Sequence, residues 1–284
     1  MAKNEGELTS VLVTGRTTDK KIVSVRKKMQ KNFRPIVYGS VLPVVLVLLW
    51  EIASRVGGVP AYQLPAPTTI LQTMLEMAQD GTLWGHVGIT TYRVFIGFVL
   101  GTVIAVVLGS MVGFYNKAEQ LFDPMIQALR SIPSLAWVPL FILWMGVGEP
   151  SKVTMIAVGV FFPVYLNIVS GILGVDRKLI EVGKMYGLKP LQLVVRIIIP
   201  ASLPSFLVGL RSGLGLGWMF VVAAELMGAS QGLGYLLVLG QNTLSPATII
   251  ASIVLFAIIG KLSDWILKSV ETRTLHWQDR LVKT

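Results

Sequence analysis

The sequence of 284 residues contains no cysteine and only two histidines, His86 and His276. A disulfide framework is therefore excluded, and zinc, iron–sulfur and haem sites lose their usual ligands. Charge is also scarce, because 14% of the residues are charged whereas 53% are hydrophobic. With a mean hydropathy of +0.69, a chain of this length cannot hide its apolar side chains in a water-soluble core. The composition predicts a membrane protein.

Motifs for enzyme chemistry are missing as well. No G-x-x-x-x-G-K-[ST] phosphate loop occurs, and the nearest cluster, residues 146–152, has the wrong spacing. The sequence also has no G-x-S-x-G elbow and no H-E-x-x-H pair. We therefore expect no catalytic residues, no metal ligands and no ATP hydrolysis by this chain alone.

Six hydrophobic stretches approach the roughly 20 helical residues that cross a hydrocarbon layer. They predict an all-α, polytopic protein with six transmembrane helices. Pro133 and Pro139 interrupt the third stretch, and a broken helix needs cover from neighbouring protein. Asp123-Pro124, Glu149-Pro150 and Ser245-Pro246 resemble helix starts. The predicted spans are residues 37–56, 92–115, 126–147, 152–174, 204–227 and 246–270.

The net charge of +10 is distributed unevenly along these spans. Residues 1–36 hold nine basic residues, and five more lie in each of the segments 175–200 and 261–284. With Lys117, about twenty basic residues fall on one side, whereas the loops 57–91, 146–152 and 228–245 contain only Lys152. The positive-inside rule then predicts that both termini are cytoplasmic.

This topology divides the chain into four parts. Residues 1–36 form a basic cytoplasmic tail that is suited to anionic lipid, and the lack of interleaved aromatic residues argues against nucleic acid. Residues 37–91 hold the first span and an external loop, in which residues 64–77 predict a turn and a short interfacial helix. Residues 92–270 form the transmembrane core, and residues 271–284 are a second cytoplasmic tail.

Glycines recur four residues apart in the second and fifth spans. The pairs are 97/101, 109/113, 209/213 and 213/217. Small residues at this spacing let another helix approach closely, which predicts intramembrane packing, with helix movement during gating as the alternative.

The segment 175–200 predicts a cytoplasmic helix, turn and helix. Asp176 is a capping residue, Gly187 suits a left-handed helix stop, and Pro190 can begin the second helix. Apolar residues at helical spacing, among them Leu179, Val182 and Tyr186, form a ridge on the first helix. An apolar ridge exposed to the cytoplasm needs a groove on a partner protein.

The spacing of Glu181, Gly187, Ile197 and Pro200 resembles the E-A-A-x3-G-x9-I-x-L-P signature of permease subunits of bacterial ABC importers. Val182 and Gly183 replace the two alanines, and Ile199 replaces the leucine. Residues 64–67, 130–133, 143–146 and 228–234 are similar to the nitrate, taurine and aliphatic-sulfonate branch, with sulfonate permeases the most similar.

This resemblance implies a type I ABC importer permease fold in a bacterial inner membrane, with a cytoplasmic coupling helix. It implies a second copy of the chain, two cytoplasmic ATPase subunits that bind ATP and Mg²⁺, and a periplasmic or lipid-anchored solute-binding protein. The expected contacts with the ATPase come from the coupling loop: Asp176, Leu179, Glu181, Val182, Gly183, Tyr186, Gly187 and Leu188.

Ionisable and polar residues inside spans are candidates for contact with the transported solute. Arg211 could attract a small oxyanion, and a structural ion pair or a side chain reaching the cytoplasmic surface is its alternative role. Asn167, Trp144 and Trp218 could line the pathway, with packing as the alternative. No solute role is expected for Glu225, which would hydrogen-bond to the 228–234 loop, or for Arg93, which would anchor the second span externally.

The expected function is therefore uptake of a small anion by alternating access, with an aliphatic sulfonate or taurine as the solute. Nitrate or another small nitrogen-containing solute is the alternative within this branch. An ion-coupled secondary carrier is an alternative class, and it would call for acidic residues at the midplane and an inverted repeat, neither of which is clear here. A membrane scaffold without transport is the third.

Overall fold

The protein structure is a computed structural model that describes residues 41–56, 60 and 63–277. It separates into two compact units, residues 1–68 and 69–284. In the first unit, residues 41–56 are helical, and Glu51 accepts hydrogen bonds from Arg55 and from the backbone of Thr68. The first predicted span is therefore helical where it is described. The predicted basic tail, residues 1–36, lies outside the described residues.

The second unit is built from helices, and the described residues include no strand. Two short irregular turns, the 3₁₀ turn η1 (Ser134–Trp137) and the π-helical turn η2 (Val194–Ile198), interrupt the longer helices. The helices in chain order are α2 (Pro67–Gln79), α3 (Thr82–Phe114), α4 (Asn116–Ser131), α5 (Val138–Met145), α6 (Glu149–Leu173), α7 (Arg177–Met185), α8 (Pro190–Leu193), α9 (Ile199–Leu226), α10 (Leu233–Asn242) and α11 (Pro246–Thr274).

Four helical segments in the described residues are long and apolar enough to cross a membrane: α3, α6, α8 to α9 taken together, and α11. A fifth span results if α4 and α5 count as one helix, which is bent by 87°. The bend follows Ser131, where Pro133 prevents the helix from continuing. The expected break in the third span is therefore confirmed. The second, fourth, fifth and sixth predicted spans are confirmed as helices with shifted ends, whereas the first is helical over residues 41–56, the part that is described.

Three boundaries differ from the sequence prediction. α3 begins at Thr82 after Gly81, whose φ of +77° is left-handed, so ten residues assigned to the external loop are helical. α4 begins at Asn116, so Pro124 lies inside a helix and does not start one. The loop 228–245 contains α10, which the prediction missed. The starts of α6 at Glu149 and of α11 at Pro246 are confirmed.

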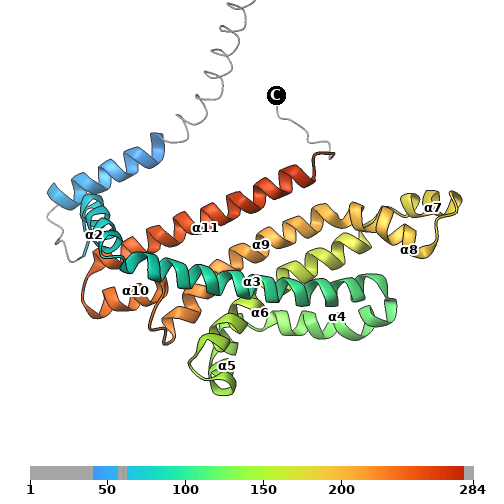
Figure 1. Ribbon diagram of the computed structural model, residues 1–284, viewed down its shortest axis with the longest axis horizontal. Helices are drawn as coiled ribbons and strands as arrows, with labels where there is room; N and C mark the ends of the chain where they lie inside the picture. The colour runs from blue at the N-terminus through green and yellow to red at the C-terminus, as the bar shows by residue number, and fades with distance from the viewer. Residues whose placement is uncertain (1–40, 57–59, 61–62, 278–284) are drawn as a thin grey trace, which may run out of the picture. The chain divides into compact units, whose positions relative to one another are not determined.

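The centre of the second unit is formed by α3, α6 and α9, which run side by side (Figure 1). Glycines permit this close packing: a Cβ at Gly97 would lie 2.6 Å from Ile156 Cγ2, and one at Gly209 would lie 2.7 Å from Asn167 Cβ. Gly213 and Gly109 face α6 in the same way. The prediction that these glycines pack against a neighbouring helix is confirmed.

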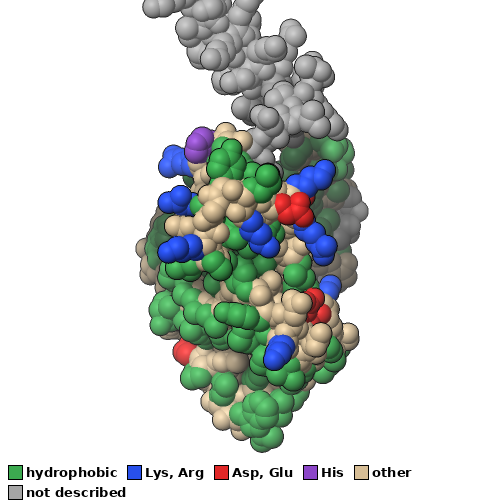
Figure 2. Space-filling model, turned by 90° about the vertical axis from the view of Figure 1, so that its right-hand side faces the viewer, with side chains coloured by type: hydrophobic (Ala, Val, Ile, Leu, Met, Phe, Trp, Pro, Cys, Tyr) green, Lys and Arg blue, Asp and Glu red, His purple; other side chains and the backbone are tan. Residues whose placement is uncertain are grey.

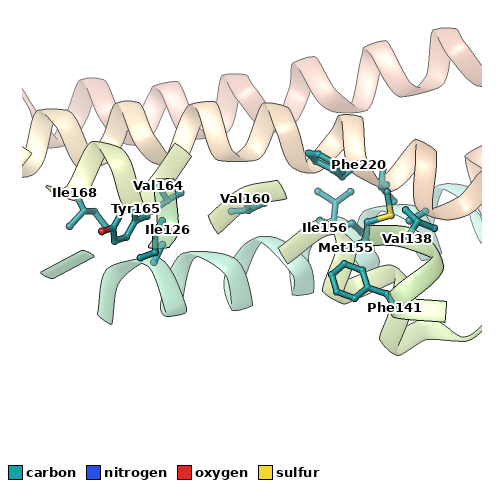
Figure 3. Packing of buried hydrophobic residues seen from close by; sticks show 14 of the residues in the cluster. Ile126, Val138, Phe141, Met155, Ile156, Val160, Val164, Tyr165, Ile168 and Phe220 are labelled. Atoms are coloured by element: carbon teal, nitrogen blue, oxygen red, sulfur yellow. The ribbon is translucent and has the colours of Figure 1, made fainter. Parts of the chain in front are cut away.

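The buried core follows α6 along its length. Tyr165, Val164, Val160 and Ile156 are all fully buried, and Figure 3 shows them in a row. Ile126 of α4 lies beside Tyr165 near one end of this row, and Val138 of α5 lies beside Met155 near the other. The bent pair α4–α5 therefore packs alongside α6.

The α3–α6–α9 core has two ends, and we name them by their residues. The coupling end holds α7, α8, η2 and the ends of α3 and α6 near residues 114 and 173. The loop end holds the start of α3, Glu149 at the start of α6, the end of α9 near Leu226, and the 227–234 loop. The charge distribution predicts that the coupling end is cytoplasmic.

Candidate functional site

At the coupling end, α7 and α8 form the predicted helix, turn and helix. The Asp176 carboxylate accepts a hydrogen bond from the Lys178 backbone N–H at 2.9 Å and caps α7. Gly187 has a φ of +74°, which is the left-handed stop. The N–H of Lys189 donates to Gln192 Oε1 at 2.9 Å, and Pro190 begins α8. The local structure predicted for residues 176–190 is therefore confirmed.

The apolar side chains of this turn are exposed. Tyr186 is 83% exposed and Met185 87% exposed, and Leu179 and Val182 are each half exposed. Glu181 is exposed beside them. Because exposed apolar area in water is unfavourable, about 25 cal/mol per Å², this ridge is suited to burial against another protein.

The inner side of the same turn is tightly packed. A Cβ at Gly183 would lie 2.5 Å from Ile197 Cδ1 of η2 and from Leu193 Cδ2 of α8. The Leu188 N–H donates to the Gly183 carbonyl at 3.1 Å, and the Leu188 side chain is partly buried. α7 is thereby fixed to η2, which continues directly into α9. This contact gives a physical reason for glycine where the resembling signature has alanine.

Basic side chains surround the ridge. Figure 2 looks at the face that carries α7 and α8 and shows Lys and Arg side chains scattered over it between hydrophobic ones. The segment contributes five exposed basic residues: Arg177, Lys178, Lys184, Lys189 and Arg196. The ridge and these charges form a surface that could receive an apolar groove with an acidic rim.

The loop end contains a buried ion-pair network around Arg93 of α3. The Arg93 side chain is 2% exposed, and the Glu225 side chain of α9 is fully buried. Arg93 NH1 donates to Glu225 Oε1 at 2.7 Å and to the Gln231 carbonyl at 2.7 Å, and Arg93 Nε donates to Glu149 Oε2 of α6 at 2.7 Å. One guanidinium therefore joins three spans and the loop before α10.

Glu225 uses its remaining hydrogen-bonding capacity on its neighbours. Its carboxylate accepts from Thr90 Oγ1 at 2.8 Å and from the Gly234 N–H at 2.7 Å. Gly232, with a φ of +128°, brings the loop so close that a Cβ there would lie 2.5 Å from the carboxylate. The predicted hydrogen bond from Glu225 to the 228–234 loop is therefore confirmed.

The central place of Arg93 in this network was missed by the sequence prediction. With the second span assigned to residues 92–115, Arg93 fell at an external surface, whereas the structure puts it three turns into α3. A signal was available, because Arg93 and Glu225 are the opposite charges inside otherwise apolar runs. His86 joins the same region by accepting from the Gly232 N–H at 3.0 Å.

Arg211 forms the structural ion pair that was its alternative role. Its Nε donates to Asp264 Oδ1 of α11 at 2.6 Å, its NH2 donates to Asp264 Oδ2 at 3.1 Å, and Glu271 lies 3.8 Å away. The predicted local pair of Lys261 and Asp264 is also present, at 3.8 Å. Contact between Arg211 and a solute stays a prediction that this geometry does not favour.

The other three predicted pathway residues do not gather around Arg211. The Asn167 side-chain amide donates to the Pro163 carbonyl at 2.8 Å, and its Cβ faces Gly209. Trp218 Nε1 donates to Ser263 Oγ of α11 at 2.8 Å. Trp144, on α5, is 65% exposed. Asn167 and Trp218 thus make helix contacts, and a single four-residue site is not formed.

Two further observations bear on ligands. An apolar cavity of about 250 Å³ lies towards the coupling end between α3, α6 and α9, and Ser110 and Ser202 are the polar side chains in its lining. In the described part of the chain, no group of three His, Asp or Glu side chains could hold a metal ion.

Comparison with known proteins gives a consistent family. The model of the binding-protein-dependent transport system inner membrane component matches residues 97–276. The aliphatic sulfonates transport permease protein SsuC of Bacillus subtilis is 41% identical over 90% of this chain and 93% of its own length. SsuC of Escherichia coli is 38% identical over 83% and 90%, and the Escherichia coli taurine transport permease TauC is 32% identical over 83% and 87%.

Among solved structures, the chain is similar to an inward-facing MetNI methionine ABC transporter. The match has a TM-score of 0.55 and 20% identity, and it covers 68% of this chain and 98% of the other. This likeness supports the predicted fold, that of the membrane subunit of a type I importer. Family and fold together place the chain beside an ATPase and a solute-binding protein in a membrane, and they agree with the matched E-A-A-like segment. The chain belongs to the family of inner membrane components of binding-protein-dependent transport systems.

Proposed function

We propose that this permease subunit, paired with a second copy of itself, forms the pathway by which an aliphatic sulfonate or taurine is imported. Transport of a sulfonate is supported by the likeness to SsuC and TauC over most of the chain. The energy comes from two ATPase subunits that dock on the coupling end. The solute arrives on a separate binding protein at the loop end.

The exposed ridge of α7 is the observation that carries this proposal. Leu179, Val182 and Tyr186 project from a turn whose inner side is held by Gly183 against Ile197. A partner that buries the ridge would therefore push on η2 and α9 without first deforming α7. This arrangement suits a helix that passes the movement of an ATPase to the membrane-spanning helices, with both termini on the ATPase side.

Coupling is tested with the reconstituted complex of permease, ATPase and binding protein. We expect Tyr186→Ala combined with Leu179→Ala to abolish co-purification of the ATPase, because the buried apolar area is lost. Leu244→Ala is the matched control, since Leu244 is 84% exposed in the turn between α10 and α11 and belongs to neither α7 nor α8. Intact association and intact substrate-stimulated hydrolysis in the double variant, or in Glu181→Ala, would refute the coupling role.

The solute is tested by growth. A bacterial strain that lacks its own sulfonate uptake, given this permease with its ATPase and binding protein, should grow on ethanesulfonate or taurine as the sole sulfur source. The same strain without the permease should not. If the complex instead supports growth only when nitrate is the sole nitrogen source, the solute is nitrate, the alternative within this branch. Active uptake in the absence of any ATPase would favour an ion-coupled carrier.

Pairing of two copies and contact with lipid rest on exposed apolar surface. Large hydrophobic side chains are exposed along the spans, for example Val103 and Val107 on α3 and Ile258 on α11. In a membrane this surface is covered by lipid or by a second copy. Molar mass of the detergent-purified complex by light scattering distinguishes one permease copy from two.

A further inference from the structure

The helix α4 has a polar side that hydrocarbon cannot accommodate. Its polar residues recur at helical spacing, so they share one side, whereas Leu121 (69% exposed) and Met125 (53% exposed) lie on the other. Buried polar groups without partners are costly in lipid, so this side must face water, protein or solute. The polar residues are Asn116, Glu119, Gln120, Asp123, Gln127, Arg130 and Ser131.

Arg130 lies at the depth of the middle of α6. Arg130 follows Asn116, the first residue of α4, by fourteen residues, which is about 21 Å of helix. This length is less than the thickness of a hydrocarbon layer, about 30 Å. Asp123 accepts a hydrogen bond from the Tyr165 hydroxyl at 3.1 Å, which fixes α4 beside α6. Ile126 packs near Tyr165 and Val138 packs near Met155 (Figure 3), so Arg130 falls between these two levels.

Charge pairing sets Arg130 apart. Of the 25 basic residues, 20 belong to segments predicted to be cytoplasmic, and five do not. Four of these five have a carboxylate within 4.0 Å: Arg55, Arg93, Lys152 and Arg211. Within the ranges that the structure describes, Arg130 has no such ion pair; its side chain is exposed, and its contact is with Gln127 Oε1 at 3.5 Å.

We propose that Arg130, with Gln127 and Ser131 beside it, contacts the sulfonate group of the solute during its passage. The planar guanidinium can present two parallel N–H donors to two sulfonate oxygens, and no carboxylate of the described chain competes for them. The guanidinium of Arg211, by contrast, already donates both of these hydrogen bonds to the carboxylate of Asp264. This assignment rests on the proposed transport of sulfonates.

The rate of solute uptake by Arg130 variants tests this role directly. In proteoliposomes that contain the full complex and saturating liganded binding protein, Arg130→Gln should lower the rate of ethanesulfonate uptake about tenfold or more, the value of a charged hydrogen bond. Arg130→Lys should retain more uptake, since the charge remains. Lys117→Gln is the control, an exposed basic residue at the other end of the same helix.

Each other outcome of this experiment has a definite meaning. If the Arg130→Gln complex takes up ethanesulfonate at the rate of the unaltered complex, the assignment is overturned. It is also overturned if the Arg130→Gln variant no longer assembles as two copies while Arg130→Lys and Lys117→Gln still do, because Arg130 would then be an interface residue. If the unaltered complex takes up neither ethanesulfonate nor taurine, the proposed function fails and not merely the role of Arg130.

A second measurement does not depend on transport. Because the chain has no cysteine, Ser131→Cys creates one labelling site beside Arg130. We expect the anionic reagent 2-sulfonatoethyl methanethiosulfonate to modify it several times faster with Arg130 present than in Ser131→Cys/Arg130→Gln, and ethanesulfonate to slow it. Met125→Cys, on the apolar side, should stay unmodified. Equal labelling rates with and without Arg130 would overturn the proposal.

Discussion

The two ends of the α3–α6–α9 core treat polarity in opposite ways. At the coupling end, Tyr186 and Met185 expose apolar area to solvent, whereas at the loop end Arg93 and Glu225 bury opposite charges that satisfy one another. A buried charge without its partner is costly, so the Arg93 network at the loop end is satisfied by partners from this chain. Exposed apolar area costs less and is removed by binding, so the coupling end is suited to a contact with another protein.

The largest expected effect on stability comes from breaking the ion-pair network at the loop end. Arg93→Met leaves the Glu225 carboxylate buried without its cation, and we expect the free energy of unfolding to fall by about 3–5 kcal/mol. Thermal unfolding of the purified complex measures the loss. Arg55→Met is the control, because Arg55 is 63% exposed beside Glu51, and an ion pair that water screens should change the free energy of unfolding far less. A second change, Glu225→Leu, should restore part of the loss.

The next effect concerns the packing of α3 on α6, where two glycine-to-alanine changes in α3 should alter the stability of the protein in opposite directions. Gly97→Ala places a methyl group 2.6 Å from Ile156 Cγ2 and should destabilise the protein by about 1–3 kcal/mol. Gly88→Ala, also in α3, meets nothing within 4 Å and should stabilise it by about 0.5–1 kcal/mol through helix propensity. Equal melting temperatures for the two variants would contradict the close packing of α3 on α6.

A smaller effect separates stability from coupling. Gly187 (φ +74°) and Gly81 (φ +77°) are both left-handed, and a Cβ added at either position would meet nothing within 4 Å. Replacing either with alanine should cost about 1–2 kcal/mol of left-handed backbone strain. Gly187→Ala should also lower substrate-stimulated ATP hydrolysis, because it tilts α7, whereas Gly81→Ala should leave it unchanged. If both variants hydrolyse ATP equally well, α7 is not the coupling element.

The smallest effect concerns the cap of α7. Asp176→Ala removes the acceptor of the Lys178 N–H and should cost about 1 kcal/mol, whereas Asp176→Asn should stay within a few tenths of the unaltered protein. Hydrogen exchange of the α7 amides is the measurement, since the loss is local. Faster exchange in the asparagine variant than in the alanine variant would be inconsistent with this cap.

Local signals predicted local structure well. The Asp176 cap, the Gly187 stop and the Pro190 start each depend on neighbouring backbone atoms, and all three are confirmed. Helix ends without such signals were placed less well: α3 begins ten residues before its predicted start. An apolar run defines the middle of a span, but polar residues such as Arg93 are read as its end even when a partner neutralises them.

The candidate solute contacts show the same limit. Arg211 stood out in the sequence as an arginine inside a span, yet Asp264, 53 residues later, occupies it. Arg130 was noted only as part of the 130–133 motif and not as a solute contact, because the sequence shows neither that α4 packs beside α6 nor which carboxylates come near each arginine. The pairing of charged side chains depends on distances between residues of different helices. The periodicity of residues along a single helix carries no information about those distances.

By itself, the sequence determined the membrane class, the helical composition, the predicted orientation and the coupling turn, since hydropathy, charge and short-range caps act through composition and neighbours. Only the tertiary structure decided which charges neutralise each other. Arg93, Glu149 and Glu225 come from three helices more than fifty residues apart, and their meeting depends on how the glycine-lined helices pack. That packing also leaves Arg130 without a carboxylate partner among the described residues.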